Sequence, residues 1–156
     1  MNAVDLFPGY CIDTSALIDL WRRKYPPDVF RSLWGSFENL INQGLIAAPK
    51  EVLRELEKRD DELLRWAKQH HSIFIDFDTN QERELKLILA KFPDMVDYLS
   101  DSPQADPFIV ALAKSIDWLV VSSESPGINK IPTVCAAFGI KCIQLLEFFR
   151  EQNWSF

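Results

Sequence analysis

The chain has 156 residues, 47% of them hydrophobic and 26% charged, and carries 23 Asp and Glu against 17 Lys and Arg, for a net charge of -6. This composition excludes a disordered chain and a fibrous repeat, and the length predicts one domain over residues 1–156 with a sizeable core. The acidic balance argues against a protein that coats itself in nucleic acid, but it is compatible with a localised site.

The sequence also predicts where the protein works. Its longest apolar runs, such as Phe108 to Ala113, are far shorter than the ~20 residues of a membrane helix, so we expect no membrane contact. Residues 1–8 lack the basic and apolar regions of a secretory signal. Cys11, Cys135 and Cys142 suit neither a disulfide framework nor a zinc site and are expected to be buried as small apolar residues. We therefore expect a cytoplasmic protein.

Apolar periodicity and turn residues predict alternating strands and helices. In the first half we expect a strand over 10–12, helices over 15–24 and 30–41 with Gly44 ending the second, a weak strand over 45–48, and a long helix from Pro49 to about Gln69. From residue 72 we expect a strand over 72–77, a helix over 82–92, and a helix fragment and loop over 93–104. A helix from Asp106 then leads to a buried strand over 118–121 and a loop over 122–130. The last expected elements are a short helix over 131–138, a strand over 140–145, and a terminal helix and tail over 146–156.

This alternation predicts an α/β fold, because parallel strands need long crossover connections and these are usually helices. We expect a three-layer α/β/α sandwich with a mainly parallel central sheet. Such sheets bind ligands beyond the carboxyl ends of their strands, where the strand order reverses.

Carboxylates follow several of the predicted strands or begin the helices after them. These are Asp13, Glu51, Glu55, Asp106 and Glu124, which come from four separate segments. Two unit charges 4 Å apart repel by about 4 kcal/mol at an effective dielectric constant of 20, so such a cluster needs a cation or bound protons. Oxygen ligands without a His or Cys cluster favour a hard divalent cation, Mg²⁺ or Mn²⁺.

Each acid also has a simpler interpretation. Asp13 and Asp106 precede helices, where a carboxylate accepts backbone N–H bonds as a cap. Glu51 suits the first turn of a helix, and Glu55 and Glu124 suit solvated positions. Capping predicts scattered acids, whereas the sheet rule predicts converging ones.

Basic residues gather in two places. They are Arg22, Arg23, Lys24 and Arg31 in the first, and Lys50, Arg54, Lys58 and Arg59 in the second. Arg22, Arg23, Lys50 and Arg54 are candidates to bind the phosphates of a nucleic acid. The alternative is a solvated helix face with ion pairs.

Aromatic and histidine residues carry weaker signals. His70 and His71 suit the end of a helix, and most tryptophans suit core faces. Trp154 and Phe156 in the tail would form a partner surface if exposed, and the alternative is a tail folded onto its own core.

Three segments together match a known family. They are Cys-Ile-Asp-Thr-Ser-Ala-Leu-Ile-Asp over 11–19, Glu-Val-Leu-Arg-Glu-Leu over 51–56, and Ala-Asp-Pro-Phe-Ile-Val-Ala-Leu-Ala over 105–113. In this order and spacing they resemble PIN-domain nucleases, including the VapC-type toxins, over roughly residues 10–145. The resemblance implies a PIN-like fold and a metal-dependent endoribonuclease that uses Mg²⁺ or Mn²⁺.

The resemblance also implies roles for particular residues. Asp13, Glu55 and Asp106 would hold the metal, and Thr14 and Ser15 would support them. The family usually closes its site with Thr-x-Asp, whereas this chain has Ser122-Ser-Glu124. Serine thus replaces threonine in the supporting position, and Glu124 replaces aspartate as a fourth catalytic acid.

The resemblance further implies an RNA substrate, an antitoxin partner and a homodimer. A PIN-like module that binds RNA or protein without cleaving it is the alternative, consistent with the altered motif. A phosphatase with Asp13 as nucleophile is disfavoured because that chemistry needs a second Asp at position 15, which is Ser15 here. No Gly-rich phosphate loop is present, which disfavours an NTPase.

Overall fold

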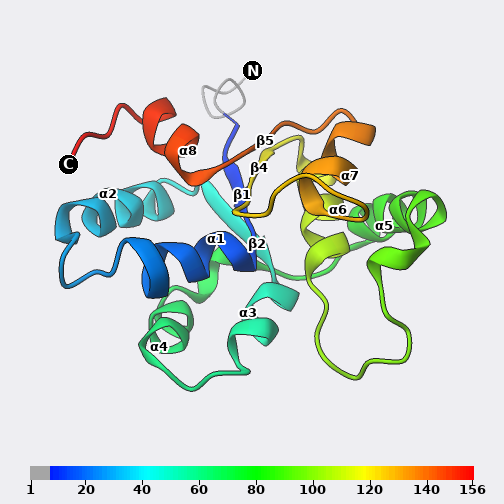
Figure 1. Cartoon of the computed structure of the whole chain (residues 1–156), viewed down its shortest axis with the longest axis horizontal. Helices are drawn as coiled ribbons and strands as arrows, with labels where there is room; N and C mark the ends of the chain where they lie inside the picture. Colours follow the sequence, from blue (N-terminus) through cyan, green and yellow to red (C-terminus); the bar gives the residue numbers. More distant parts are fainter. Residues whose placement is uncertain (1–7) are drawn as a thin grey trace.

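A five-stranded parallel sheet forms the middle layer of the protein (Figure 1). The computed structural model describes residues 8–156. The expectation of no secretory signal concerns residues 1–8, and it therefore falls almost entirely outside the described residues. The strands are β1 (Tyr10–Ile12), β2 (Ile46–Pro49), β3 (Phe74–Ile75), β4 (Leu119–Val121) and β5 (Cys142–Ile143). They lie in the order β3-β2-β1-β4-β5, and every pair is parallel. The predicted α/β class is confirmed.

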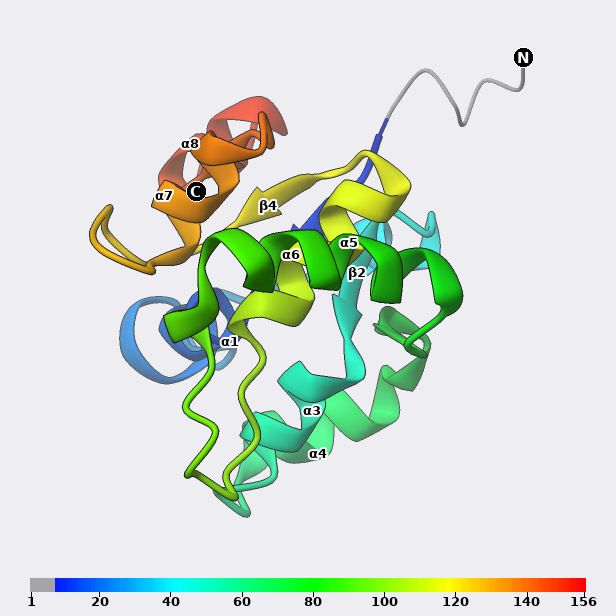
Figure 2. The ribbon, with the colours of Figure 1, turned by 90° about the vertical axis from the view of Figure 1, so that its right-hand side faces the viewer.

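Helices cover both faces of this sheet (Figures 1 and 2). One face carries α1 (Thr14–Ile18), its π-helical continuation η2 (Asp19–Lys24), α2 (Arg31–Asn42), α3 (Lys50–Leu56), α4 (Glu62–Gln69) and α8 (Leu145–Glu151). The other face carries α5 (Thr79–Lys91), α6 (Asp106–Ile116) and α7 (Ile131–Ala137). Two short 3₁₀ turns, η3 (His71–Ile73) and η4 (Pro93–Met95), complete the elements of the described chain. The architecture is the predicted three-layer α/β/α sandwich.

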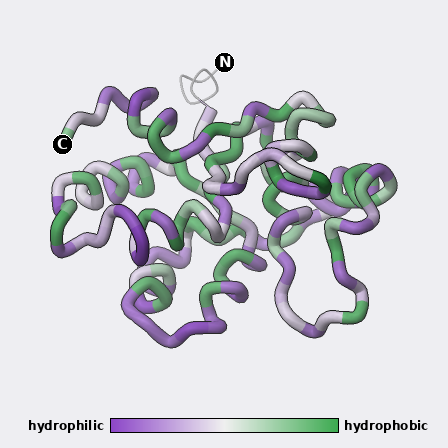
Figure 3. Tube along the Cα trace, viewed as in Figure 1, coloured by the Kyte–Doolittle hydropathy of each residue, from purple (hydrophilic) through white to green (hydrophobic). Residues whose placement is uncertain are grey.

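Alternation along the strands divides the core between the two faces. Ile12 and Val121 point into one cluster, while their neighbours Cys11 and Val120 point into the other. The first cluster is rich in aromatic rings, including Trp34 and Trp66, whereas the second is mainly aliphatic. Apolar and polar residues alternate along the outer helices (Figure 3), as expected for helices that bury one side.

Glycines at the ends of β1 and α2 meet local requirements of the backbone. A Cβ atom at Gly9, just before β1, would lie 2.6 Å from the carbonyl oxygen of Leu45 and 2.7 Å from the ring of Trp118. Gly44 has φ +73° and ends α2 as predicted, because glycine adopts the left-handed region without a steric penalty. These glycines let β1 pair closely with its neighbours and turn the chain into β2.

The predicted long helix over 49–69 is wrong. Pro49 is the extended last residue of β2 rather than the first residue of a helix, and α3 ends at Leu56. A second helix, α4, begins after Asp61, whose side chain accepts a hydrogen bond from the backbone N–H of Leu64. The charged run between the helices offers its own caps, which compete with continuation of the helix.

The strands predicted over 72–77 and 140–145 are too long. The observed strands β3 and β5 have two residues each, because they are the edges of the sheet and pair on one side only. Residues 71–73 form the 3₁₀ turn η3 instead. Cys142 on β5 is only partly buried, contrary to the expectation that all three cysteines are buried.

The C-terminal tail folds back onto the core. The ring of Trp154 lies 5.4 Å from that of Phe148 and 5.8 Å from that of Phe149. Phe156 keeps 58% of its surface exposed. Across residues 8–156, no helix has the length and apolarity to cross a membrane.

Candidate functional site

The strand order places a crevice between β1 and β4. From β1 the chain proceeds to β2 on one side, while β4 pairs with β1 on the other, so the order reverses at this point. Asp13 follows β1, and its backbone N–H donates to the carbonyl of Val121 at 3.1 Å. Ser122 follows β4. Parallel sheets bind ligands at such a reversal, beyond the carboxyl ends of the strands.

Asp13 is the most buried acid of the site, with 2% of its surface exposed. Its carboxylate accepts hydrogen bonds from the backbone N–H of Ala16 at 2.8 Å, from the hydroxyl of Ser15 at 2.8 Å and from that of Ser122 at 2.5 Å. Burial raises the pKa of Asp13 to about 7 against the opposing effect of these hydrogen bonds, and the charge of Glu124 raises it further. Asp13 therefore caps α1 and also stands at the bottom of the crevice.

Asp106 does not act as a helix cap, contrary to the simpler interpretation. It is the first residue of α6, Ala105 occupies the cap position, and the helix has no side-chain cap. Burial raises the pKa of Asp106 to about 6, and the carboxylates of Glu124 and Glu55 raise it further, while Lys130 lowers it. The carboxylate of Asp106 therefore faces other carboxylates.

Hydroxyl groups and a backbone amide hold the two glutamates. The hydroxyl of Thr14 donates to Glu55 at 2.6 Å, which joins α1 to α3. The carboxylate of Glu124 accepts a hydrogen bond from the backbone N–H of Ile131 at 2.9 Å, and the backbone N–H of Glu124 donates to Ser122 at 3.0 Å. Three of the residues predicted to support the site, Thr14, Ser15 and Ser122, thus contact its acids, whereas Glu51, also predicted as a supporting residue, does not.

Four of the five predicted acids meet at the crevice, and one does not. Asp13, Glu55, Asp106 and Glu124 are linked by the contacts and charge effects above. Glu51 instead pairs with Arg54 at 3.5 Å and lines a pocket of about 390 Å³ between α3 and the segment before α6. Spacing along α3 cannot separate Glu51 from Glu55, because both residues lie on the same side of the helix.

The basic residues predicted to bind substrate all have acidic partners. The pairs are Arg22 with Asp61 at 2.7 Å, Arg23 with Asp19 at 3.4 Å, Lys50 with Asp76 at 2.5 Å, and Arg54 with Glu51 at 3.5 Å. These ion pairs agree with the alternative prediction, in which the basic residues form a solvated helix face with acidic partners and do not bind a nucleic acid. Lys130, which the sequence reasoning missed, is the cation that acts on Asp106. A single lysine in a polar loop gives no sequence signal.

The donor chemistry of the cluster fits a divalent cation. Its ligands would be carboxylate oxygens, and burial together with the neighbouring carboxylates raises the pKa values of Asp13 and Asp106, which a bound cation would offset. As placed within residues 8–156, no three Asp, Glu, His or Cys side chains form a ready-made metal site. The oxygens are engaged by the chain's own donors instead, Glu55 by Thr14 and Glu124 by Ile131.

Fold and site together define an α/β protein with a parallel sheet and a cluster of carboxylates at the point where its strand order reverses. The chain belongs to the family described as a domain of unknown function, DUF4411, whose model matches residues 10–156. No curated protein matches the chain. The matched region includes every residue of the acidic cluster.

Proposed function

We propose that the protein is a metal-dependent endoribonuclease of the PIN-like type that hydrolyses RNA phosphodiester bonds. The observation that carries this proposal is the meeting of Asp13, Glu55, Asp106 and Glu124 from four segments at the β1/β4 crevice. A structural cluster would pair these acids with cations, yet Asp106 faces two carboxylates and one lysine. Such a site attracts a divalent cation and suits the hydrolysis of a phosphodiester.

The chain's own residues have distinct tasks in this proposal. Asp13, Asp106 and Glu55 would hold Mg²⁺ or Mn²⁺, which supplies an activated water and stabilises the charge that develops on the phosphate. Ser15 and Ser122 fix both oxygens of Asp13 in position. Glu55 and Glu124 would exchange their bonds to Thr14 and Ile131 for contacts with the metal and its water.

Cleavage of an RNA that has both a stem and a single-stranded loop tests the proposal. Wild type and Asp106→Asn are purified identically and assayed with Mn²⁺, with Mg²⁺ and with EDTA. We expect cleavage by the wild type alone, and EDTA should abolish it. Cleavage by both proteins would indicate a contaminant and count against the proposal.

The biological setting proposed with this activity is a cytoplasmic toxin that acts as a homodimer and is neutralised by an antitoxin protein. Its support is the resemblance of residues 11–19, 51–56 and 105–113 to VapC-type toxins. Overexpression should then arrest growth, and Asp106→Asn should not. Normal growth with active enzyme would overturn the toxin role and leave the nuclease.

A non-catalytic module that binds RNA or protein is the second candidate. One observation favours it: both oxygens of Asp13 already accept hydrogen bonds from Ser15 and Ser122, and within residues 8–156 no three acids are placed so that they could hold a metal ion together. This candidate predicts binding that neither EDTA nor Asp106→Asn weakens. It moves ahead if the folded wild type is inert with every metal and RNA.

A further inference from the structure

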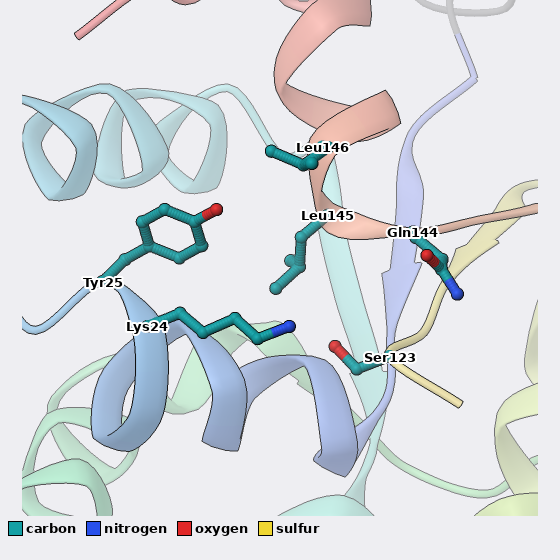
Figure 4. Close-up of a pocket in the computed structure, with 6 residues that line it drawn as sticks. All are labelled: Lys24, Tyr25, Ser123, Gln144, Leu145 and Leu146. Carbon is teal, nitrogen blue, oxygen red and sulfur yellow. The ribbon is translucent and has the colours of Figure 1, made fainter. Parts of the chain in front are cut away.

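A second, smaller pocket adjoins the acidic cluster. It measures about 110 Å³ and lies between the end of η2, the residue after Ser122 and the start of α8 (Figure 4). Its lining residues are Lys24, Tyr25, Ser123, Gln144, Leu145 and Leu146. These residues come from three segments that are far apart in sequence, and two of the segments follow β4 and β5. The pocket therefore opens at the carboxyl edge of the sheet, on the same side as the acids.

A short chain of hydrogen bonds joins this pocket to Asp13. The backbone N–H of Ser123 donates to the hydroxyl oxygen of Ser15 at 3.0 Å, and that hydroxyl donates to Asp13 at 2.8 Å. Ser122, the neighbour of Ser123, contacts Asp13 directly. A group bound in the pocket would thus lie next to the crevice rather than on a separate surface.

The walls of the pocket combine apolar and polar groups. Leu145 and Leu146 supply an aliphatic side, and the ring of Tyr25 is held edge-on by Phe30 at 5.3 Å and Phe149 at 5.1 Å. The pocket, at about 110 Å³, is smaller than an apolar cavity of about 150 Å³ that holds one benzene molecule, so it admits the edge of a single base and not a whole base or a stacked pair. Entry of a base requires that it be unstacked.

The polar wall suits a nucleotide. The ammonium group of Lys24 points toward the hydroxyl of Ser123 (Figure 4) and lies 3.5 Å from Asp19, a carboxylate that it shares with Arg23. Lys24 keeps 60% of its side chain exposed, so it can reach a phosphate. The amide of Gln144 offers both a donor and an acceptor to a base edge. Within residues 8–156, neither the Ser123 hydroxyl nor the Gln144 amide is engaged in a hydrogen bond.

We propose that this pocket is a subsite for one unstacked nucleotide of single-stranded RNA, with Lys24 on a phosphate and Gln144 reading the base. The proposal rests on the proposed function, because it places the neighbouring phosphodiester at the acidic cluster. It names the substrate as the single-stranded part of an RNA and Gln144 as a residue that determines specificity.

Binding without cleavage tests the subsite by itself. The probe is a short fluorescein-labelled single-stranded RNA, titrated in EDTA against wild type, Lys24→Met and the control Lys86→Met, whose exposed lysine lies on α5 across the sheet. Loss of one phosphate contact lowers the salt slope by about 0.7 and weakens binding about fivefold at 0.1 M salt. We expect this for Lys24→Met and no change for Lys86→Met. Equal affinity and slope in all three proteins would overturn the subsite, and so would an equal loss in both variants.

Base preference supplies the second measurement. Wild type and Gln144→Ala are titrated in EDTA with oligo(A), oligo(C) and oligo(U), and their melting temperatures are compared to confirm that both fold. We expect the wild type to discriminate among the three and Gln144→Ala to bind them more evenly. If Asp106→Asn abolishes cleavage while the Lys24 and Gln144 variants bind like the wild type, the nuclease stands and the subsite fails. If no protein cleaves but binding depends on Lys24 and Gln144, the subsite stands and the nuclease fails.

Discussion

Two aspartates show how differently the protein treats the same side chain. Asp61, at the start of α4, accepts a hydrogen bond from the guanidinium of Arg22 at 2.7 Å and lies 3.4 Å from Arg59. The bond to Arg22 holds the pKa of Asp61 below its ordinary value, against the opposing effect of burial. Asp106, at the start of α6, is partly buried near Glu124 and Glu55, and its pKa is raised to about 6.

The difference separates a structural acid from the acid that we propose to be functional. Asp61 caps a helix and pairs with the guanidinium of an arginine, so its negative charge has partners of opposite charge. Asp106 caps nothing and faces like charges, which costs folding free energy. A fold retains such a cost where the site uses it, most often to bind a cation or a proton. Substitutions in the two regions should therefore have opposite effects on activity and stability.

Asp106→Asn gives the largest expected effect on activity. Cleavage of RNA should fall by about two to three orders of magnitude, because a charged oxygen ligand is lost from the site. The melting temperature should stay equal or rise, since the substitution removes one of several like charges. Asp60→Asn, whose side chain is 89% exposed, is the matched control and should retain full activity. A large drop in stability for Asp106→Asn would contradict a functional role for this charge.

The pH dependence of stability should follow the raised pKa values. In the metal-free protein, Asp13 and Asp106 titrate at about 7 and about 6 rather than 3.8, so the folded state binds more protons than the unfolded state across this window. Stability must then fall as the pH rises from about 4 to 7. Asp61 acts in the opposite sense. Its pKa is lowered in the folded state, so the stabilisation it provides is lost as the pH falls below the ordinary pKa of an aspartate.

Thermal melts in EDTA from pH 5 to pH 8 measure this effect. We expect the melting temperature to decline by several degrees, and added Mg²⁺ or Mn²⁺ should restore it more at pH 8 than at pH 5, because protons no longer compete. The variant Asp106→Asn serves as the control and should decline less. A melting temperature that climbs steadily over this range would be incompatible with the raised pKa values.

Asp61→Ala should be the most destabilising change in the paired region. It removes the cap on Leu64 and leaves the guanidinium of Arg22 without its partner, in a side chain that is only 17% exposed. Together these losses should lower the free energy of unfolding by about 1–3 kcal/mol, measured by urea denaturation. Asp61→Asn keeps a capping oxygen and should cost less. Metal-dependent cleavage per folded molecule should match the wild type in both variants.

Arg65→Ala gives the smallest expected effect. Arg65 bonds to Glu62 and Asp60, but all three side chains are more than half exposed, so solvent screens their charges. Neither the urea midpoint nor cleavage should change measurably. A clear loss of stability would contradict the expectation that solvent screens this surface network.

Much of the fold can be predicted from the sequence because it depends on local patterns. Buried strands such as 118–121 are marked by continuous apolar residues, and Gly44 marks the end of a helix by its freedom to take a positive φ. The break between α3 and α4 could not be predicted in this way. Asp61, which caps the start of α4, is also held by a hydrogen bond from Arg22, a residue 39 positions away.

In the candidate site, too, some features follow from the sequence alone and others only from the tertiary structure. The sequence by itself determined the α/β class and which acids follow strands, since both depend on the order of residues along the chain. The tertiary structure decided that Glu55 joins the cluster and Glu51 does not, that Asp106 is no cap, and that Ser122 binds Asp13. It also added Lys130 and the pocket of Lys24, Ser123 and Gln144. These features depend on which segments the parallel sheet brings to one edge, and burial and charge there arise only when distant parts of the chain meet.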